Sequence, residues 1–74
     1  MNEILKERFL VLNIIQKYLE ISYFKNQFKA AQWLDIPNPH LGGFIPKTLI
    51  LMGKADKVWS YILESEYERG ELEV

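Results

Sequence analysis

The chain has 74 residues, no cysteine and a formal net charge of -1. This length fits one small domain, and without cysteine the chain can form neither disulfides nor thiolate metal sites, as is common in a reducing compartment. The near-neutral charge provides no general attraction to nucleic acid, and no apolar run approaches the roughly 20 residues of a membrane span. We therefore expect a cytoplasmic protein in which residues 1–74 form a single domain.

The pattern of apolar residues predicts a long helix over residues 2–24. Two stripes run along it at helical spacing: the first holds Leu5, Phe9, Leu12 and Leu19, and the second holds Ile4, Val11, Ile15 and Tyr18. An apolar arc this wide is more than one intramolecular contact needs. We expect the second stripe to pair two copies of the chain in a homodimer. The alternative is that the helix is buried at the centre of the chain.

A second, short helix is predicted to begin after Asn26, whose side-chain oxygen can accept a hydrogen bond from an unpaired backbone N–H. Phe28 and Ala31 follow at helical spacing. Ile36 precedes a proline and is pushed toward extended geometry, so the helix should stop near Asp35.

The next segment is rich in proline and glycine. Asn38 and Pro39 predict a single capped turn, which the pair Gly42-Gly43 can end with positive φ angles. Pro46 then opens a third helix, expected over residues 46–52 with Gly53 after it. We interpret nine residues of this region as defining the fold and not as contacting a partner: Trp33, Leu34, Pro37, Asn38, Pro39, Leu41, Gly42, Gly43 and Pro46.

The last helix has the clearest amphipathic pattern. Its apolar positions recur at i, i+3, i+4, i+7 and i+8: Ala55, Val58, Trp59, Ile62 and Leu63. Gly70 should end this helix. The expected fold is an all-α small bundle of one long N-terminal helix, two short helices joined by a Pro/Gly-rich loop, and a C-terminal amphipathic helix.

Residues 24–72 resemble the toxin-binding domain of the Xre/MbcA/ParS antitoxins. The shared pattern is an alanine three residues before a Trp-Leu pair, a Pro-Asn-Pro turn, Leu-Gly-Gly, and a proline that opens a Leu-rich helix. This chain carries it at Ala30, Trp33, Leu34, Pro37, Asn38, Pro39, Leu41, Gly42, Gly43, Pro46 and Leu49, with Phe24, Val58, Ile62 and Gly70 also matching.

The chain departs from the family at several positions. Only one helix is predicted ahead of the matching region, so the family's DNA-binding helix-turn-helix is not carried over. Lys25 stands where the family often has glycine, and Ile45 where it often has threonine. Because isoleucine cannot cap the helix that Pro46 opens, another group or water must satisfy that terminus. The segment between the last two helices is shortened to residues 52–54.

The resemblance implies a protein-binding function. Such domains neutralise a toxin, usually of the NAD-consuming RES-domain class, by occluding its active site with their C-terminal part. By position, the partner-binding residues would be Tyr67, Glu68, Gly70, Glu71, Leu72, Glu73 and Val74. This end of the chain is acidic, which equally fits a solvated helix face and tail.

No residue pattern indicates catalysis, a cofactor or a bound metal. His40 is the one histidine of the chain and lacks a second ligand, so we interpret it as a solvated loop side chain. Two other classes of function stay open: a self-assembling helical module without a toxin partner, and a nucleic-acid binder that uses Lys17, Lys25 and Lys29. We expect a non-enzymatic chain that does not itself bind nucleic acid or membrane.

Overall fold

The structure is a computed structural model that describes residues 2–68, with side chains placed as far as Ser65. Its elements are α1 (Glu3–Tyr18), the π-helical turn η1 (Leu19–Tyr23), α2 (Gln27–Asp35), the 3-10 turn η2 (Pro39–Leu41), α3 (Pro46–Leu51) and α4 (Ala55–Glu68). No strand occurs between residues 2 and 68. The predicted all-α bundle is confirmed.

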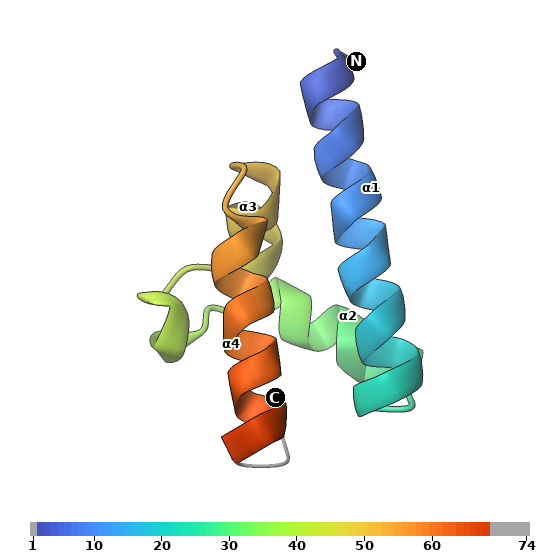
Figure 1. The fold of residues 1–74 in the computed structure, drawn as a ribbon, viewed down its shortest axis with the longest axis vertical. Coiled ribbons are helices and arrows are strands. Elements are labelled where there is room, and N and C mark those ends of the chain that lie inside the picture. The colour runs from blue at the N-terminus through green and yellow to red at the C-terminus, as the bar shows by residue number, and fades with distance from the viewer. Residues whose placement is uncertain (1, 69–74) are drawn as a thin grey trace.

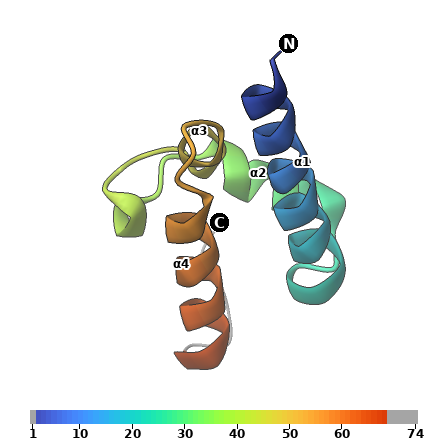
Figure 2. The same cartoon turned by 45° about the horizontal axis from the view of Figure 1, so that its top comes forward.

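The two longest helices stand side by side and run in the same direction, as Figure 1 shows. α2 crosses from the end of α1 toward α4, and α3 packs against α1, α2 and α4. Figure 2 shows that η2 lies on the side of α4 remote from α1. The helices α1 and η2 therefore occupy opposite edges of the molecule.

One apolar core joins all four α-helices. Its buried members are Leu12, Ile15, Leu19, Ala30, Trp33, Leu34, Leu49, Ile50, Val58 and Ile62. Burying a Leu, Ile or Val side chain contributes about 1.5–3 kcal/mol, so this set supplies the main stabilisation of the fold. Leu5 and Phe9, from the first predicted stripe, are each 39% exposed. Figure 1 shows that the amino-terminal turns of α1 project beyond α3.

The long helix predicted over residues 2–24 is not α-helical throughout. Its α-helical part ends at Tyr18, and the next five residues form the π-helical turn η1. The amide of Phe24 donates to the carbonyl oxygen of Leu19 at 2.8 Å, an i to i-5 hydrogen bond. Lys25, two residues after the turn, has a φ of 55° in the left-handed region. This is where the resembling family often has glycine.

Asparagine side chains cap two elements as predicted. The Oδ1 of Asn26 accepts from the amides of Phe28 and Lys29 at 2.8 and 3.0 Å, and α2 ends at Asp35. The Oδ1 of Asn38 accepts from the amide of His40 at 2.9 Å, at the start of η2. Both predicted helix starts are confirmed.

The backbone of Asn38 also holds the loop that follows η2. Its carbonyl oxygen accepts from the amides of Leu41 and Gly43, and its own amide donates to the carbonyl oxygen of Phe44. Gly42 and Gly43 adopt the predicted positive φ angles of 70° and 81°. With Asn38 only 8% exposed, these bonds make the loop a closed unit that fixes where Phe44 emerges.

The third helix begins at Pro46 as predicted but ends one residue early, at Leu51. The side chain of Ile45 makes no capping hydrogen bond, in agreement with the sequence analysis. At the other end, Lys54 N–H donates to Leu49 and Gly53 N–H donates to Ile50. These are the two bonds of a Schellman motif with glycine at the left-handed position, where φ is 87°.

The amphipathic pattern of α4 predicted its inner face with one error. Val58 and Ile62 are fully buried, and Ala55 and Trp59 are partly buried against the core. Leu63, predicted on the same stripe, is 47% exposed. The stripe of a four-turn helix drifts around its axis, and among the described residues none covers this side of α4.

Candidate interaction surfaces

Tyr61 of α4 connects α2 with the loop around η2. Its ring is stacked with that of Trp33, with centroids 6.3 Å apart, and with that of His40, with centroids 5.4 Å apart. A small cleft of about 140 Å³ is lined by Trp33, Tyr61 and the segment from residue 36 to 40. His40 is exposed, as predicted, but it also helps to hold the loop against α4.

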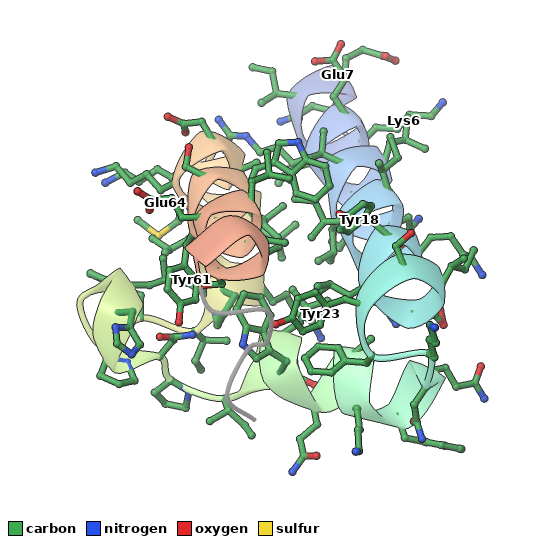
Figure 3. All side chains as sticks on the ribbon, turned by 60° about the horizontal axis from the view of Figure 1, so that its bottom comes forward. Lys6, Glu7, Tyr18, Tyr23, Tyr61 and Glu64 are labelled. Carbon is green, nitrogen blue, oxygen red and sulfur yellow. The ribbon has the colours of Figure 1, made fainter. Side chains whose placement is uncertain are left out.

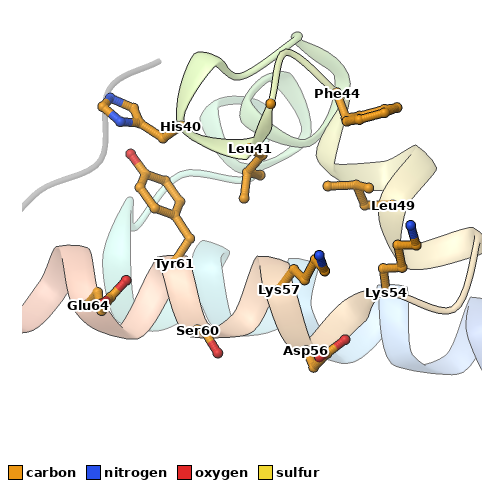
Figure 4. Close-up of a pocket in the computed structure, with 11 residues that line it drawn as sticks. His40, Leu41, Phe44, Leu49, Lys54, Asp56, Lys57, Ser60, Tyr61 and Glu64 are labelled. Atoms are coloured by element: carbon orange, nitrogen blue, oxygen red, sulfur yellow. The ribbon is translucent and has the colours of Figure 1, made fainter.

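A larger groove separates this loop from α4, and we name it the loop–α4 groove. It has a volume of about 540 Å³ and is lined by His40, Leu41, Gly42, Phe44, Leu49, Lys54, Asp56, Lys57, Ser60, Tyr61 and Glu64. Figure 4 shows His40 and Tyr61 at one end, and Phe44, Leu49 and Lys54 at the other. The groove is lined by both apolar and charged side chains.

The chemistry of the loop–α4 groove fits contact with another protein. Phe44 is 51% exposed at its rim although it is a large apolar side chain. Lys54 and Lys57 are matched by Asp56 and Glu64, so the groove has no strong charge of one sign. Among the described residues no three His, Asp or Glu side chains cluster as metal ligands would. Exposed aromatic side chains are enriched at protein interfaces, whose rim is polar.

The outer side of α1 is a second candidate surface. Leu10, Ile14 and Ile21 are each more than half exposed, and Ile14 is 63% exposed. A shallow groove of about 540 Å³ runs along this side and is lined by Leu10, Asn13, Ile14, Lys17, Tyr18, Ile21 and Ser22. A row of exposed aliphatic side chains is a candidate site for contact with another protein.

This surface differs from the predicted self-association stripe. Ile4 and Val11 are exposed, but Ile15 is 2% exposed and belongs to the core. Tyr18 is partly buried on the side of α1 that faces α4 (Figure 3), with its ring 5.0 Å from that of Trp59. Ile15 is therefore not available to a partner, because α3 and α4 cover that side of α1.

The sequence analysis missed the outward residues Leu10, Ile14 and Ile21. Their signal is present in the sequence, since Leu10 and Ile14 lie four residues apart and Ile14 and Ile21 lie seven apart. It was hidden by the width of the apolar arc. Two stripes of similar composition flank one another, and only the packing of α3 and α4 decides which of them faces inward.

Of the seven residues predicted to bind a partner, two lie in the described part of the chain. Tyr67 and Glu68 belong to the last turn of α4, while Gly70, Glu71, Leu72, Glu73 and Val74 lie outside the described residues. The three lysines of the nucleic-acid alternative, Lys17, Lys25 and Lys29, are exposed but sit on α1, on the connection and on α2. Lys17 is also 3.4 Å from the carboxylate of Glu20.

None of the helices in the described part of the chain is long and apolar enough to cross a bilayer.

The comparisons with known proteins give no relative from which a role could be carried over. No family model, no curated protein and no solved structure matches this chain.

Proposed function

We propose that this chain is a non-enzymatic protein-binding module, the toxin-binding domain of a type II antitoxin that neutralises a RES-type, NAD-consuming toxin. The observation that carries the proposal is the half-exposed Phe44 at the rim of the loop–α4 groove, beside a core that is already closed without it. An aromatic side chain held out of the core in this way is a typical anchor for a protein partner.

The loop that bears Phe44 supports this function by its rigidity. Asn38 binds the loop through its side chain and its backbone, and His40 stacks on Tyr61. A surface that is already ordered before binding loses little conformational entropy on association. The residues that build the loop are also those that carry the resemblance to the antitoxin domain.

The acidic C-terminal residues complete the proposed mechanism. A site that handles NAD must hold a pyrophosphate, so it tends to present arginines and backbone N–H groups to negative charge. Glu68, Glu71 and Glu73 would engage those groups, while Leu72 and Val74 would add apolar contact. The module would then block the toxin's active site by occupying it.

A second candidate is a self-assembling helical module that has no toxin partner. It is favoured by the exposed aliphatic row on the outer side of α1, which is suited to homodimer formation. Homodimer formation is also compatible with toxin binding, because α1, which carries most of this row, and the loop around η2 lie at opposite edges of the molecule (Figure 1).

The test is co-expression with a RES-type toxin encoded beside this gene, with cell growth and NAD level as the readouts. We expect the full chain to restore both, and deletion of residues 71–74 to weaken protection while the helical circular dichroism is retained. Phe44→Ser should also weaken protection. Met52→Ser is the matched control, because Met52 is 49% exposed but does not line the groove.

Three results would contradict the proposal in whole or in part. If the full chain neither protects cells nor co-purifies with the toxin, the self-assembling module is the better reading. If Phe44→Ser and Met52→Ser protect equally, the loop–α4 groove has no part in toxin binding. Equal protection by the full and shortened chains would remove the C-terminal residues from the mechanism.

A further inference from the structure

Six residues on the outer side of α1 and η1 follow a heptad spacing. They are Glu3, Glu7, Leu10, Ile14, Lys17 and Ile21, separated by 4, 3, 4, 3 and 4 residues, and all six are exposed. We name them the α1 seam. Three of the six are apolar and three are charged, and the alternation of four and three places them along one side of the helix, at the spacing of the contact positions in a coiled coil.

The shape of the seam also fits a second helix. The shallow groove on this side is lined by Leu10, Asn13, Ile14 and Lys17, among others. Residues at i, i+3, i+4 and i+7 are the four that form the hole for a knob of a partner helix in a coiled coil. In Figures 1 and 2 α1 lies at the edge of the molecule, where a second helix can approach.

Charge along the seam selects the orientation of that second helix. In a parallel pair of identical chains, each residue meets itself, so Glu7 would face Glu7 and Lys17 would face Lys17. In an antiparallel pair, the two-fold axis can pass beside residue 12 of each copy. Glu7 of one copy then meets Lys17 of the other, and Leu10 meets Ile14. Glu3 then meets Ile21. The antiparallel pair thus brings opposite charges together at Glu7 and Lys17 and keeps Leu10 against Ile14, whereas the parallel pair opposes like charges at positions 3, 7 and 17.

We propose that two copies of this chain pair through their α1 seams in antiparallel orientation, with Glu7 of each copy facing Lys17 of the other. The inference rests on the homodimer of the proposed function and specifies its surface and register. It does not depend on the toxin. A two-fold axis makes each contact occur twice, so every substitution in the seam acts twice per dimer.

The first test is a charge exchange, with the dimer dissociation constant measured by sedimentation equilibrium at low salt. Glu7→Lys and Lys17→Glu should each weaken the dimer by about tenfold, because each converts two attractive contacts into two repulsive ones. The double variant with both changes should return to the wild-type affinity. Both substituted positions are exposed, and circular dichroism checks that all three variants stay folded.

A parallel pair predicts a different result. There the wild type already opposes like charges, so the single variants would bind as tightly as the wild type. That outcome would overturn the antiparallel register. Single variants that weaken the dimer without rescue by the double variant would also overturn the pairing of Glu7 with Lys17.

The second test uses cysteine cross-linking, which is clean because the chain has no cysteine of its own. Leu10→Cys and Ile14→Cys are made separately and then mixed under mild oxidation. The proposal expects disulfide dimers that join the two different variants. Dimers formed within each variant alone would indicate a parallel pair.

Failure of this inference is distinguishable from failure of the proposed function. A wild-type chain that stays monomeric in sedimentation at about 1 mM would overturn the seam. If that monomer still protects cells from the toxin, the antitoxin function stands without the dimer. If the dimer forms as proposed and no toxin is neutralised, the self-assembling module is supported instead.

Discussion

The guanidinium group of Arg8 donates a hydrogen bond to the carbonyl oxygen of Leu51 across 3.0 Å, so a side chain of α1 caps the carboxyl end of α3. The Schellman motif satisfies the carbonyl oxygens of Leu49 and Ile50, and Arg8 satisfies the next one. A cation at this end also interacts favourably with the helix dipole. The contact ties the start of the chain to its centre.

Arg8→Ala should destabilise the fold by about 1–3 kcal/mol, the usual contribution of a hydrogen bond to a charged group at a partly buried site. Arg8→Met is the control that retains much of the aliphatic packing. Urea unfolding followed by circular dichroism measures both. A loss below about 0.5 kcal/mol for Arg8→Ala would show that water replaces the guanidinium without cost.

Gly53→Ala should be more destabilising than Gly43→Ala. Both glycines have a positive φ, so both substitutions carry a backbone cost of about 1 kcal/mol. A Cβ at Gly53 would lie 3.0 Å from Nη2 of Arg8 and would displace the cap, whereas a Cβ at Gly43 meets no atom within 4 Å. If the two variants lose the same unfolding free energy, the effect of Gly53→Ala does not come from displacing Arg8.

Lys25→Gly should stabilise the protein by about 0.5–1 kcal/mol, because Lys25 holds a left-handed φ that costs an L-residue energy and glycine almost none. Lys29→Gly is the control. Lys29 lies in the first turn of α2, where glycine only lowers helix propensity, so that variant should be less stable. Thermal unfolding compares the two. A thermal unfolding midpoint below that of the wild type for Lys25→Gly would show that Lys25 is not strained.

Two neighbouring isoleucines should respond in opposite ways to the same change. Ile15→Glu places a charge in the core, where Ile15 is 2% exposed, and should unfold the protein. Ile14→Glu places it on the exposed α1 seam, so the fold should survive while the homodimer dissociates. Circular dichroism and light scattering separate the two effects. An unfolded Ile14→Glu would show that Ile14 supports the core.

Trp33→Ala should cost about 3–5 kcal/mol, as expected for removing a large buried aromatic side chain. Trp33→Phe should cost less than half as much, because it retains a ring against Tyr61. It also removes a buried Nε1–H that has no hydrogen-bond partner among the described residues. Chemical denaturation measures the unfolding free energy of both variants. A Trp33→Ala loss below about 1 kcal/mol would exclude Trp33 from the core.

Local signals in the sequence were sufficient for most of the fold. Asn26 and Asn38 as caps, Pro46 as a first helical residue and Gly53 as a stop each act through the nearest backbone groups, so their effects are readable without the tertiary structure. The inner face of α4 was readable for the same reason, apart from Leu63.

The surfaces were less predictable because they depend on what packs where. Ile14 and Ile15 are the same residue type on one broad apolar arc, and only the position of α3 and α4 makes one exposed and the other buried. The residue type at position 25 does not predict the left-handed conformation of Lys25. It was visible only through the glycine that the resembling family often has there.

The π-helical turn of residues 19–23 has a consequence for chain length. A π turn, which is closed by a hydrogen bond from residue i to residue i-5, contains one residue more than the α turn it replaces. Removing one exposed residue there, such as Ser22, should convert the turn to α-helix and rotate all that follows by about 100°. Length between Leu19 and Phe24 therefore sets the direction in which α2 leaves α1, and relatives of this chain that keep the fold should keep that residue count.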